Sequence, residues 1–494
     1  MPEHPSHPTT DTPSARWAEN EFATLAVKDL RRVKRWQKMA ADFHALPGAS
    51  IPQASGGWAA TKGCYRLVES GAIRPQCVFD SHCDATVRRI EGGGEQVLLV
   101  AQDTTTLNFS SHPNTEGLGP IGSKADIGRG IFVRGSLCLG ARGGNVFGLL
   151  GAEIWARDPA KFKAGPAGAR NRKPIKEKES HRWLESWRKA DALYHRLGGR
   201  RRVVSVADRE GDIYEAFAVC LQSKAARGGG ADLLVRSQHN RSRTDDPETD
   251  DGPSEQRSWQ HVEGLPVAAR IEVAVPRSAG KPARSAKLEL RYAKVELKAP
   301  ADKIKYLGMH EPLVLWLVIA REVDPPEGVE GICWRLWTTV EIGSGEQAGE
   351  VIAWYAKRWM IEEFHRILKT GCKVEERQLE SFEKLSLVLA LDLIVASYLL
   401  GLTKAAREQP GQAATAWLGA DQWQALYGYT HKTNDLPPDP PTLKQAVDWI
   451  ARLGGYLNRK CDGPPGAQAL WRGLRRLEDI TEAYRIFRDQ GNCG

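Results

Sequence analysis

The sequence contains no run of eighteen or more apolar residues, the length that a membrane-spanning helix needs. The nearest stretch, 385–402 (LSLVLALDLIVASYLLGL), is interrupted by Asp392, so it predicts a buried helix. The N-terminus also lacks the basic and then apolar order of a secretory signal. These absences argue against a membrane partner and against export, and we expect a cytoplasmic protein.

The sequence also lacks a Cys-x-x-Cys pair and any cluster of cysteines with histidines, although it has nine cysteines. An odd number of scattered cysteines indicates reduced thiols in a cytosol rather than a disulfide framework. A structural zinc site is therefore not expected.

What the sequence does have is length and a mild excess of positive charge. Its 494 residues favour two to four domains. The 69 Lys and Arg exceed the 61 Asp and Glu, which gives a net charge of +8. That excess allows a polyanionic partner, although surface loops alone can also carry it.

The hydrophobic periodicity predicts an α/β protein with helical ends. Residues 1–16 are rich in Pro, Ser, Thr and His and predict a disordered tail, and 17–70 carry a helical pattern. Strand patterns follow in the central region, at 95–109, 130–140, 145–156, 203–207 and 232–240, with further strands up to about 345. The remainder, from about 381, is helical again.

Residues 355–371 (YAKRWMIEEFHRILKTG) predict one amphipathic helix. A helical wheel places four polar side chains within about 60°, opposite an apolar arc: Tyr355, Arg358, Glu362 and Lys369. A solvated face explains the charges but not the aromatic Tyr355 and the neighbouring Trp359. Aromatic side chains beside cations are typical of a nucleic-acid contact.

Two aspartates terminate apolar strand runs, Asp103 in QDTTTLNF and Asp208 in ADREGDI. Together with Glu362 they offer hard oxygen ligands, which suit two Mg²⁺ ions, with Mn²⁺ as a substitute. Two such ions support phosphoryl transfer. Each aspartate alone is equally well explained as a turn or capping residue.

These motifs resemble the DDE transposases of the insertion-sequence-four type, and among them the group of the transposon-five transposase. The signature Y-x2-R-x3-E-x6-K of that family stands here as Tyr355, Arg358, Glu362 and Lys369. The two aspartate motifs precede it in the family's order. The stretch IFVRG (131–135) departs from the W-W-V-H run that the family often has.

The resemblance implies a ribonuclease H-like catalytic core with a β-rich insertion, at 71–380 and about 232–345. It also implies a helical DNA end-binding domain at 17–70 and a helical dimerisation region at 381–494. The expected activity is cut-and-paste transposition, by nicking, hairpin formation and strand transfer. The expected partners are double-stranded DNA, as transposon ends and target, and a second copy of the chain in a bacterial cytoplasm.

The resemblance also implies roles for individual residues. Asp103, Asp208 and Glu362 would be the catalytic and metal-binding carboxylates. Trp334 would hold the flipped base of the hairpin, with Trp359 as a second aromatic beside it. The remaining DNA contacts implied by the resemblance are Tyr355, Arg358, Lys369, Arg236, Arg31, Arg32, Arg35 and Arg66.

Two other functions fit part of the pattern. A domesticated transposase acting as a repressor would bind DNA without catalysis, but it has no use for three acidic groups that face phosphates. A metal-dependent nuclease of the same fold would need the carboxylates but neither the end-binding helices nor the dimerisation region. We also expect His365 to be a surface histidine and Trp337 to lie in the core.

Overall fold

The computed structural model describes residues 12–122, 128–162, 174–246, 248–249, 252–253, 257–275, 284–301, 303–304, 310–459 and 462–491. The chain folds into two compact units. Unit 1 comprises 1–94, 104–162 and 362–494, and unit 2 comprises 95–103 and 163–361. Because each unit is assembled from several stretches of chain, the domain boundaries expected from the sequence stay a prediction.

The N-terminal tail is the first point of difference. Residues 1–11 of the tail predicted at 1–16 lie outside the described residues. Helix α1 begins at Pro13, with the Thr12 hydroxyl accepting a hydrogen bond from the Ala15 N–H. A proline at the first helical position and a threonine cap are favourable helix-start features, so the predicted tail is too long at its C-terminal end.

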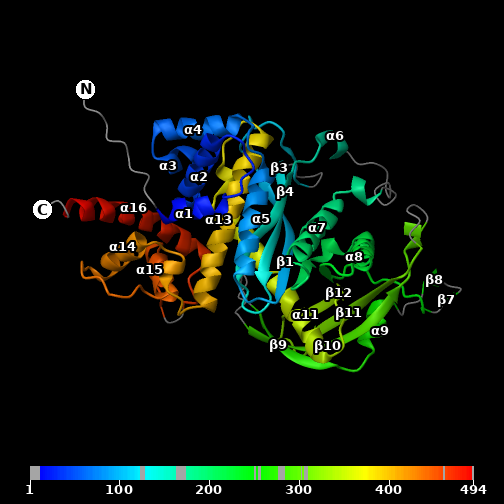
Figure 1. The fold of residues 1–494 in the computed structure, drawn as a ribbon. Coiled ribbons are helices and arrows are strands. Elements are labelled where there is room, and N and C mark those ends of the chain that lie inside the picture. Colours follow the sequence, from blue (N-terminus) through cyan, green and yellow to red (C-terminus); the bar gives the residue numbers. More distant parts are fainter. Residues whose placement is uncertain are drawn as a thin grey trace. The chain divides into compact units, whose positions relative to one another are not determined.

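Unit 1 is mainly helical (Figure 1). Its elements are α1 (Pro13–Glu21), α2 (Leu30–Ala45), α3 (Ile51–Ser55), α4 (Trp58–Glu69), α5 (Pro75–Glu91), β2 (Gly119–Pro120), β3 (Arg129–Gly140), β4 (Val146–Trp155), α6 (Pro159–Phe162), α12 (Met360–Arg366), α13 (Phe382–Glu408), α14 (Ala420–His431), α15 (Leu443–Leu453) and α16 (Ala467–Gly491). Unit 1 also holds the second half of β1 (Val97–Asn108).

Helix α13 is the centre of unit 1. It begins after Ser381, whose hydroxyl accepts a hydrogen bond from the Lys384 N–H. It is long and apolar enough to cross a membrane, but 94% of its apolar window is buried inside the protein. Helices α5 and α13 both pack on β4. The prediction of a buried helix here is confirmed.

An aromatic cluster joins the two ends of the chain within unit 1. The ring of His44, on α2, stacks on Trp17 of α1 and lies against Tyr398 of α13, with ring centroids 4.2 Å apart in both pairs. Trp417, which follows α13, lies 5.3 Å from Tyr398. Residues from the first and last fifths of the sequence therefore share one buried core.

Unit 2 is built on a mixed sheet (Figure 1). Besides the first half of β1, its elements are α7 (His181–Arg196), β5 (Arg202–Ala207), α8 (Tyr214–Arg227), β6 (Asp232–Arg236), β7 (Glu248–Thr249), β8 (Gly252–Pro253), α9 (Ser258–Glu263), β9 (Ala269–Val275), β10 (Arg284–Leu297), β11 (Leu313–Glu322), β12 (Cys333–Thr338) and α11 (Gly345–Lys357).

In the order β1-β5-β6-β12-β11-β10-β9, the first three strands are parallel and the others are antiparallel. The prediction of a mixed α/β protein with helices at both ends is confirmed at that level.

The two faces of this sheet are covered by different helices. Ala207, Val235 and Trp337 lie side by side in register and share a buried cluster with Trp183 of α7 and Phe217 of α8. Since side chains alternate along a strand, residues one position away face the opposite side. Helix α11 contacts β9 and β10 on that opposite side. Trp337 is fully buried, which confirms its predicted core position.

The buried His44 gives unit 1 a testable acid sensitivity. Burial lowers the pKa of His44 to about 3, from an ordinary value of 6.5. A lowered folded-state pKa means that the unfolded chain binds the proton first as the pH falls. The stability contributed by neutral His44 is therefore complete above pH 6.5 and is lost as the pH falls from 6.5 toward 3.

We expect His44→Phe, which keeps an aromatic ring but cannot titrate, to remove this sensitivity. Between pH 6.5 and pH 5, wild type should lose about 2 kcal/mol more unfolding free energy than the variant, because one such proton contributes about 1.4 kcal/mol per pH unit. Urea unfolding followed by tryptophan fluorescence at the two pH values measures the difference. An equal loss in both proteins would contradict the assignment.

Candidate active site

Three neighbouring parallel strands bring three predicted residues into one row, which lies at the carboxyl ends of β5 and β6 and beside the middle of β1. Strands β1 and β5 pair Ala101 with Val206, so Asp103 stands opposite Asp208 two residues further on. Strands β5 and β6 pair Ala207 with Val235, so the next step places Asp208 opposite Arg236. Neighbouring strands are about 4.8 Å apart, and residues opposite each other face the same side. The row Asp103–Asp208–Arg236 therefore forms one edge of the candidate site.

The two aspartates reach this row in different ways. Strand β5 ends at Ala207, directly before Asp208, as expected. Strand β1 continues past Asp103 to Asn108, so the expectation that Asp103 ends its strand is wrong. Because β5 stops beside it, Asp103 loses its neighbouring strand and stays half-buried rather than buried. The end of β5 therefore leaves the Asp103 side of β1 partly accessible.

The turn after β5 fixes Asp208. Its carboxylate accepts a hydrogen bond from the Glu210 N–H at 3.0 Å and caps a short 3₁₀ turn, Arg209–Gly211. Gly211 closes the turn tightly, because a Cβ there would lie 2.7 Å from the Ala207 Cβ. Asp208 is therefore held at its place by local backbone geometry as well as by the strand.

Asp212 is a structural residue in the turn that follows Asp208. Its buried carboxylate accepts hydrogen bonds from the N–H groups of Gln238 and His239, at 2.7 and 2.9 Å, and from the Arg241 guanidinium. It ties the turn after β5 to the loop after β6. Its full set of donors distinguishes it from Asp208, which lies four residues earlier.

Helix α11 brings a second group of predicted residues to the same face of the sheet. Trp334 lies two residues from Leu336, the register partner of Arg236, so it shares the face of the row. The ring of Tyr355 meets Trp334 edge to face, with centroids 5.4 Å apart. The Arg358 guanidinium lies 3.8 Å from the Asp103 carboxylate. The fold thus gathers in unit 2 residues that are spread over more than 250 positions.

The pKa of Tyr355 is affected by three charged residues of this site. Burial raises the pKa of Tyr355, while Arg358 and Arg236 act in the opposite direction and Asp208 raises it again. All three charged groups are therefore close to the phenol. The Tyr355 ring and hydroxyl form part of the floor of the site.

The signature segment is not the single helix that the sequence predicts. Helix α11 ends at Lys357 and α12 begins at Met360, with a turn at Arg358 and Trp359. The Arg358 N–H donates to the Tyr355 carbonyl, three residues earlier, at 3.0 Å. Tyr355, which the wheel places on the polar side, is only 5% exposed and packs on Trp334 of the sheet. Trp359, in the turn, is 52% exposed.

The last part of the signature belongs to unit 1. Glu362 is half-buried in the first turn of α12, and the adjacent Glu363 forms an ion pair with Lys404 at 3.0 Å. Lys369 lies in a π-helical turn, Ile367–Gly371. His365 is 7% exposed, so the expectation of a surface histidine is wrong: the helix turns this side chain into the unit 1 core, beside Phe364.

The arginines expected to contact DNA ends lie on two helices of unit 1. Arg31, Arg32 and Arg35 are exposed on α2, and Arg66 is exposed on α4. Arg31 and Arg32 pair with Asp29, the N-cap of α2, at 3.2 and 3.8 Å. Their exposure allows DNA contact but does not by itself establish it.

The donor set at the sheet edge suits a divalent cation. Two half-buried aspartates in register offer the carboxylate oxygens that Mg²⁺ prefers, with room for water and substrate oxygens as further ligands. Within the described ranges, no three His, Cys, Asp or Glu side chains are grouped so as to hold a metal. The site with three carboxylates therefore stays a prediction.

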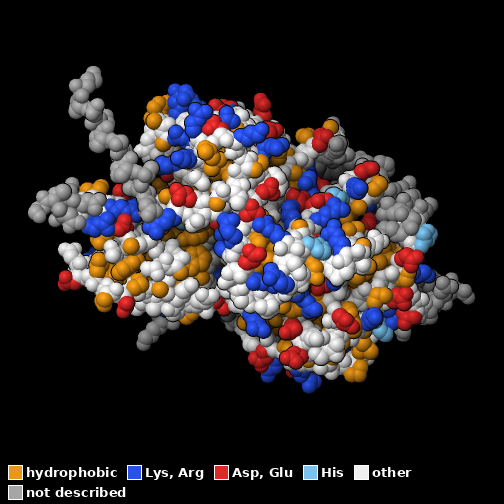
Figure 2. All heavy atoms as spheres, viewed as in Figure 1, with side chains coloured by type: hydrophobic (Ala, Val, Ile, Leu, Met, Phe, Trp, Pro, Cys, Tyr) orange, Lys and Arg blue, Asp and Glu red, His pale blue; other side chains and the backbone are white. Residues whose placement is uncertain are grey.

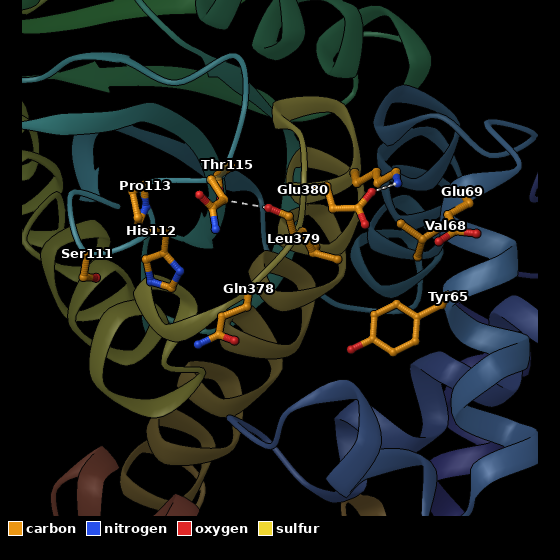
Figure 3. A pocket seen from close by; sticks show the side chains of 12 residues that line it. Tyr65, Val68, Glu69, Ser111, His112, Pro113, Thr115, Gln378, Leu379 and Glu380 are labelled. Carbon is orange, nitrogen blue, oxygen red and sulfur yellow. Dashed lines mark hydrogen bonds and ion pairs between the residues drawn. The ribbon is translucent and has the colours of Figure 1, made fainter.

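A cavity of about 410 Å³ in unit 1 is separate from these residues (Figure 3). It is lined by Tyr65 of α4, His112 and Gln378, among others. Lys384 and Glu380 form an ion pair at its wall, 2.6 Å apart. None of the predicted site residues lines it, so we do not assign the chemistry to this cavity.

Comparison with protein families identifies both ends of the chain. Residues 14–73 match the family described as transposase DNA-binding. Residues 394–494 match the family described as transposase Tn5 dimerisation domain. The first match contains α2 and α4 with their exposed arginines, and the second contains α14, α15 and α16.

The aligned aspartates lead to a prediction about metal binding. We expect Asp103→Asn and Asp208→Asn each to weaken Mn²⁺ binding by at least about tenfold, because each removes a charged ligand and leaves the strands intact. Free Mn²⁺ measured by electron paramagnetic resonance gives the affinity. Asp245→Asn, an aspartate with a 72% exposed side chain in unit 2, is the matched control. Equal affinities in all four proteins would contradict the site.

Proposed function

The chain belongs to the Tn5-like transposases, which bind DNA, and from this premise we propose that it is a cut-and-paste DNA transposase. The observation that carries the proposal is the row Asp103–Asp208–Arg236, formed by the middle of β1 and the carboxyl ends of β5 and β6. The row combines two carboxylates with a cation, as expected where a phosphate is attacked.

We propose that the core has a ribonuclease H-like fold. In chain order, its strands are β1, β3, β4, β5 and β6, and the sheet joins them in the order β4-β3-β1-β5-β6. β4 is antiparallel to β3, whereas β1, β5 and β6 are parallel. The strands β9 to β12 would then be the β-rich insertion. The position of both aspartates on the central pair supports this proposal.

Asp103, Asp208 and Glu362 would hold two Mg²⁺ ions, for which Mn²⁺ can substitute. Two bound ions would activate the attacking oxygen and stabilise the leaving oxygen of an in-line displacement. Glu362 comes from unit 1, so its place beside the aspartates is part of the proposal.

The cations and aromatic groups of the site would hold the DNA. Arg236, Arg358 and Lys369 would bind phosphates, with the guanidinium groups able to make paired hydrogen bonds. The Tyr355 hydroxyl would add a hydrogen bond from the floor of the site. Because Arg358 is only 3.8 Å from Asp103, it would keep a phosphate close to the metal-binding carboxylates.

Trp334 would stack on the base that leaves the helix when a hairpin forms at the cut end. Unstacking a base costs roughly a few kcal/mol, and an aromatic side chain offsets about 1–3 kcal/mol of it. The edge of Tyr355 fixes the orientation of the Trp334 ring. Trp359 would act as the second, more exposed aromatic.

The two ends of the chain supply the remaining steps. Residues 14–73, with Arg31, Arg32, Arg35 and Arg66, would bind the inverted repeats of the transposon ends, and residues 394–494 would pair two copies into a synaptic complex. A repressor or a nuclease of the same fold is distinguished by the reaction products, because neither would join cut ends to a target.

The first test is strand cleavage at the element's own ends in Mg²⁺. We expect Asp208→Ala to lower the cleavage rate by on the order of 10³-fold, since losing a metal ligand removes several kcal/mol of transition-state stabilisation. Gel analysis of nicked, hairpin and joined DNA measures each step. End binding by the variant, checked by mobility shift, should be unchanged.

Asp245→Ala serves as the matched control, because it removes an exposed carboxylate from the same unit. Cleavage by Asp208→Ala at the wild-type rate would contradict the catalytic assignment. A wild type that binds the ends but never cuts them in Mg²⁺ would favour the repressor. Cutting without joining would favour the nuclease.

The second test separates hairpin formation from the first nick. We expect Trp334→Ala to lose most hairpin product and to keep most of the nicking, because the flipped base exists only in the hairpin. Trp334→Phe should recover part of the hairpin, since it keeps an aromatic ring. Equal loss of nick and hairpin in Trp334→Ala, with unchanged thermal stability, would contradict this role.

A further inference from the structure

Trp58 is an unusually exposed aromatic residue. It is the first residue of α4, and its exposed fraction is 79%. A single exposed apolar side chain is common and needs no explanation by itself. Trp58 differs because it lies inside the segment that matches the transposase DNA-binding family and carries the largest apolar side chain. The sequence analysis did not select it.

Two cationic side chains follow Trp58 along α4. Lys62 and Arg66 follow it at intervals of four residues, so the three lie along one side of the helix, and all three are exposed. Tyr65 and Glu69 continue the same side toward the cavity of Figure 3. The helix therefore presents an aromatic ring at one end of a polar, mainly cationic stripe.

Helix α2 extends this cationic surface. The Arg35 guanidinium lies over Gly63 of α4, where a Cβ would be only 2.8 Å from its Nη1 atom. Lys34 and Lys38 of α2 are exposed as well. Figure 2 shows Lys and Arg side chains gathered over α2, α3 and α4, with hydrophobic side chains among them. The absence of a side chain at Gly63 allows the two helices to share one charged surface.

This combination fits duplex DNA better than a protein partner. Protein–protein interfaces are depleted in Lys at their centres, whereas phosphate backbones need several cations around each groove. An aromatic ring among such cations contacts sugars and base edges, which carry no charge. We infer that Trp58 is an apolar contact to bound end DNA, supplying affinity that does not depend on salt. The inference rests on the proposed function.

The salt dependence of binding tests this role. Affinity of the full-length chain for a duplex carrying the element's end is measured by fluorescence anisotropy over a series of salt concentrations. We expect Trp58→Ala to weaken binding by about tenfold at every salt concentration, with an unchanged slope of log K against log salt. Arg66→Ala should instead reduce that slope by about one. Trp58→Phe should recover part of the affinity.

Val314→Ala, which truncates an apolar side chain of β11 that is exposed by 42%, is the matched control and should bind as wild type. Binding by Trp58→Ala within twofold of wild type, while Arg66→Ala weakens it, would overturn the inference about Trp58 alone. A changed oligomeric state with unchanged DNA affinity would also overturn it. A wild type that does not prefer end DNA to random duplex would instead overturn the proposed function.

Discussion

The site depends on one constraint, the register of the hydrogen-bond ladders that join β1, β5 and β6. The ladders place Asp103, Asp208 and Arg236 in a row, although Asp103 lies more than a hundred positions before the other two in the sequence. A slip of one residue between β1 and β5 would turn Asp103 toward the opposite face. The buried side chains of the other face prevent the slip, since Ala207, Val235 and Trp337 occupy a closely packed cluster there. Hydrophobic packing of α7 and α8 on one face of the sheet thus fixes the positions of the candidate site residues on the other face.

The same row carries an electrostatic cost. Two carboxylates in register repel each other, and their half-buried position strengthens the repulsion relative to water. Arg358, 3.8 Å from Asp103, and Arg236, next to Asp208, offset it. Arg358 lies in the turn between α11 and α12, and its guanidinium reaches the aspartate from this turn. The break in the signature segment therefore carries a cation that lies beside Asp103.

The break between α11 and α12 is also a feature that the hydrophobic periodicity of the sequence did not predict. Apolar runs correctly indicated the strand before Asp208, and the apolar composition of 385–402 indicated the buried α13. Periodicity could not show that Tyr355 faces a tryptophan of β12, because that contact depends on sheet order. It likewise missed the burial of His365 and the exposure of Trp58, since both depend on which neighbours the fold supplies. Local patterns therefore identified the residues, and only tertiary pairing showed which of them meet.

The two matched ends of the chain are physically coupled within unit 1. Trp17 and His44 belong to the DNA-binding segment, whereas Tyr398 and Trp417 belong to the dimerisation segment, and the four half-buried rings form one cluster of neighbouring aromatic contacts. Such aromatic contacts add about 0.5–1.5 kcal/mol for each pair beyond the area they bury. The helices α2 and α4 of the DNA-binding segment therefore pack directly on α13, the helix on which the dimerisation segment begins.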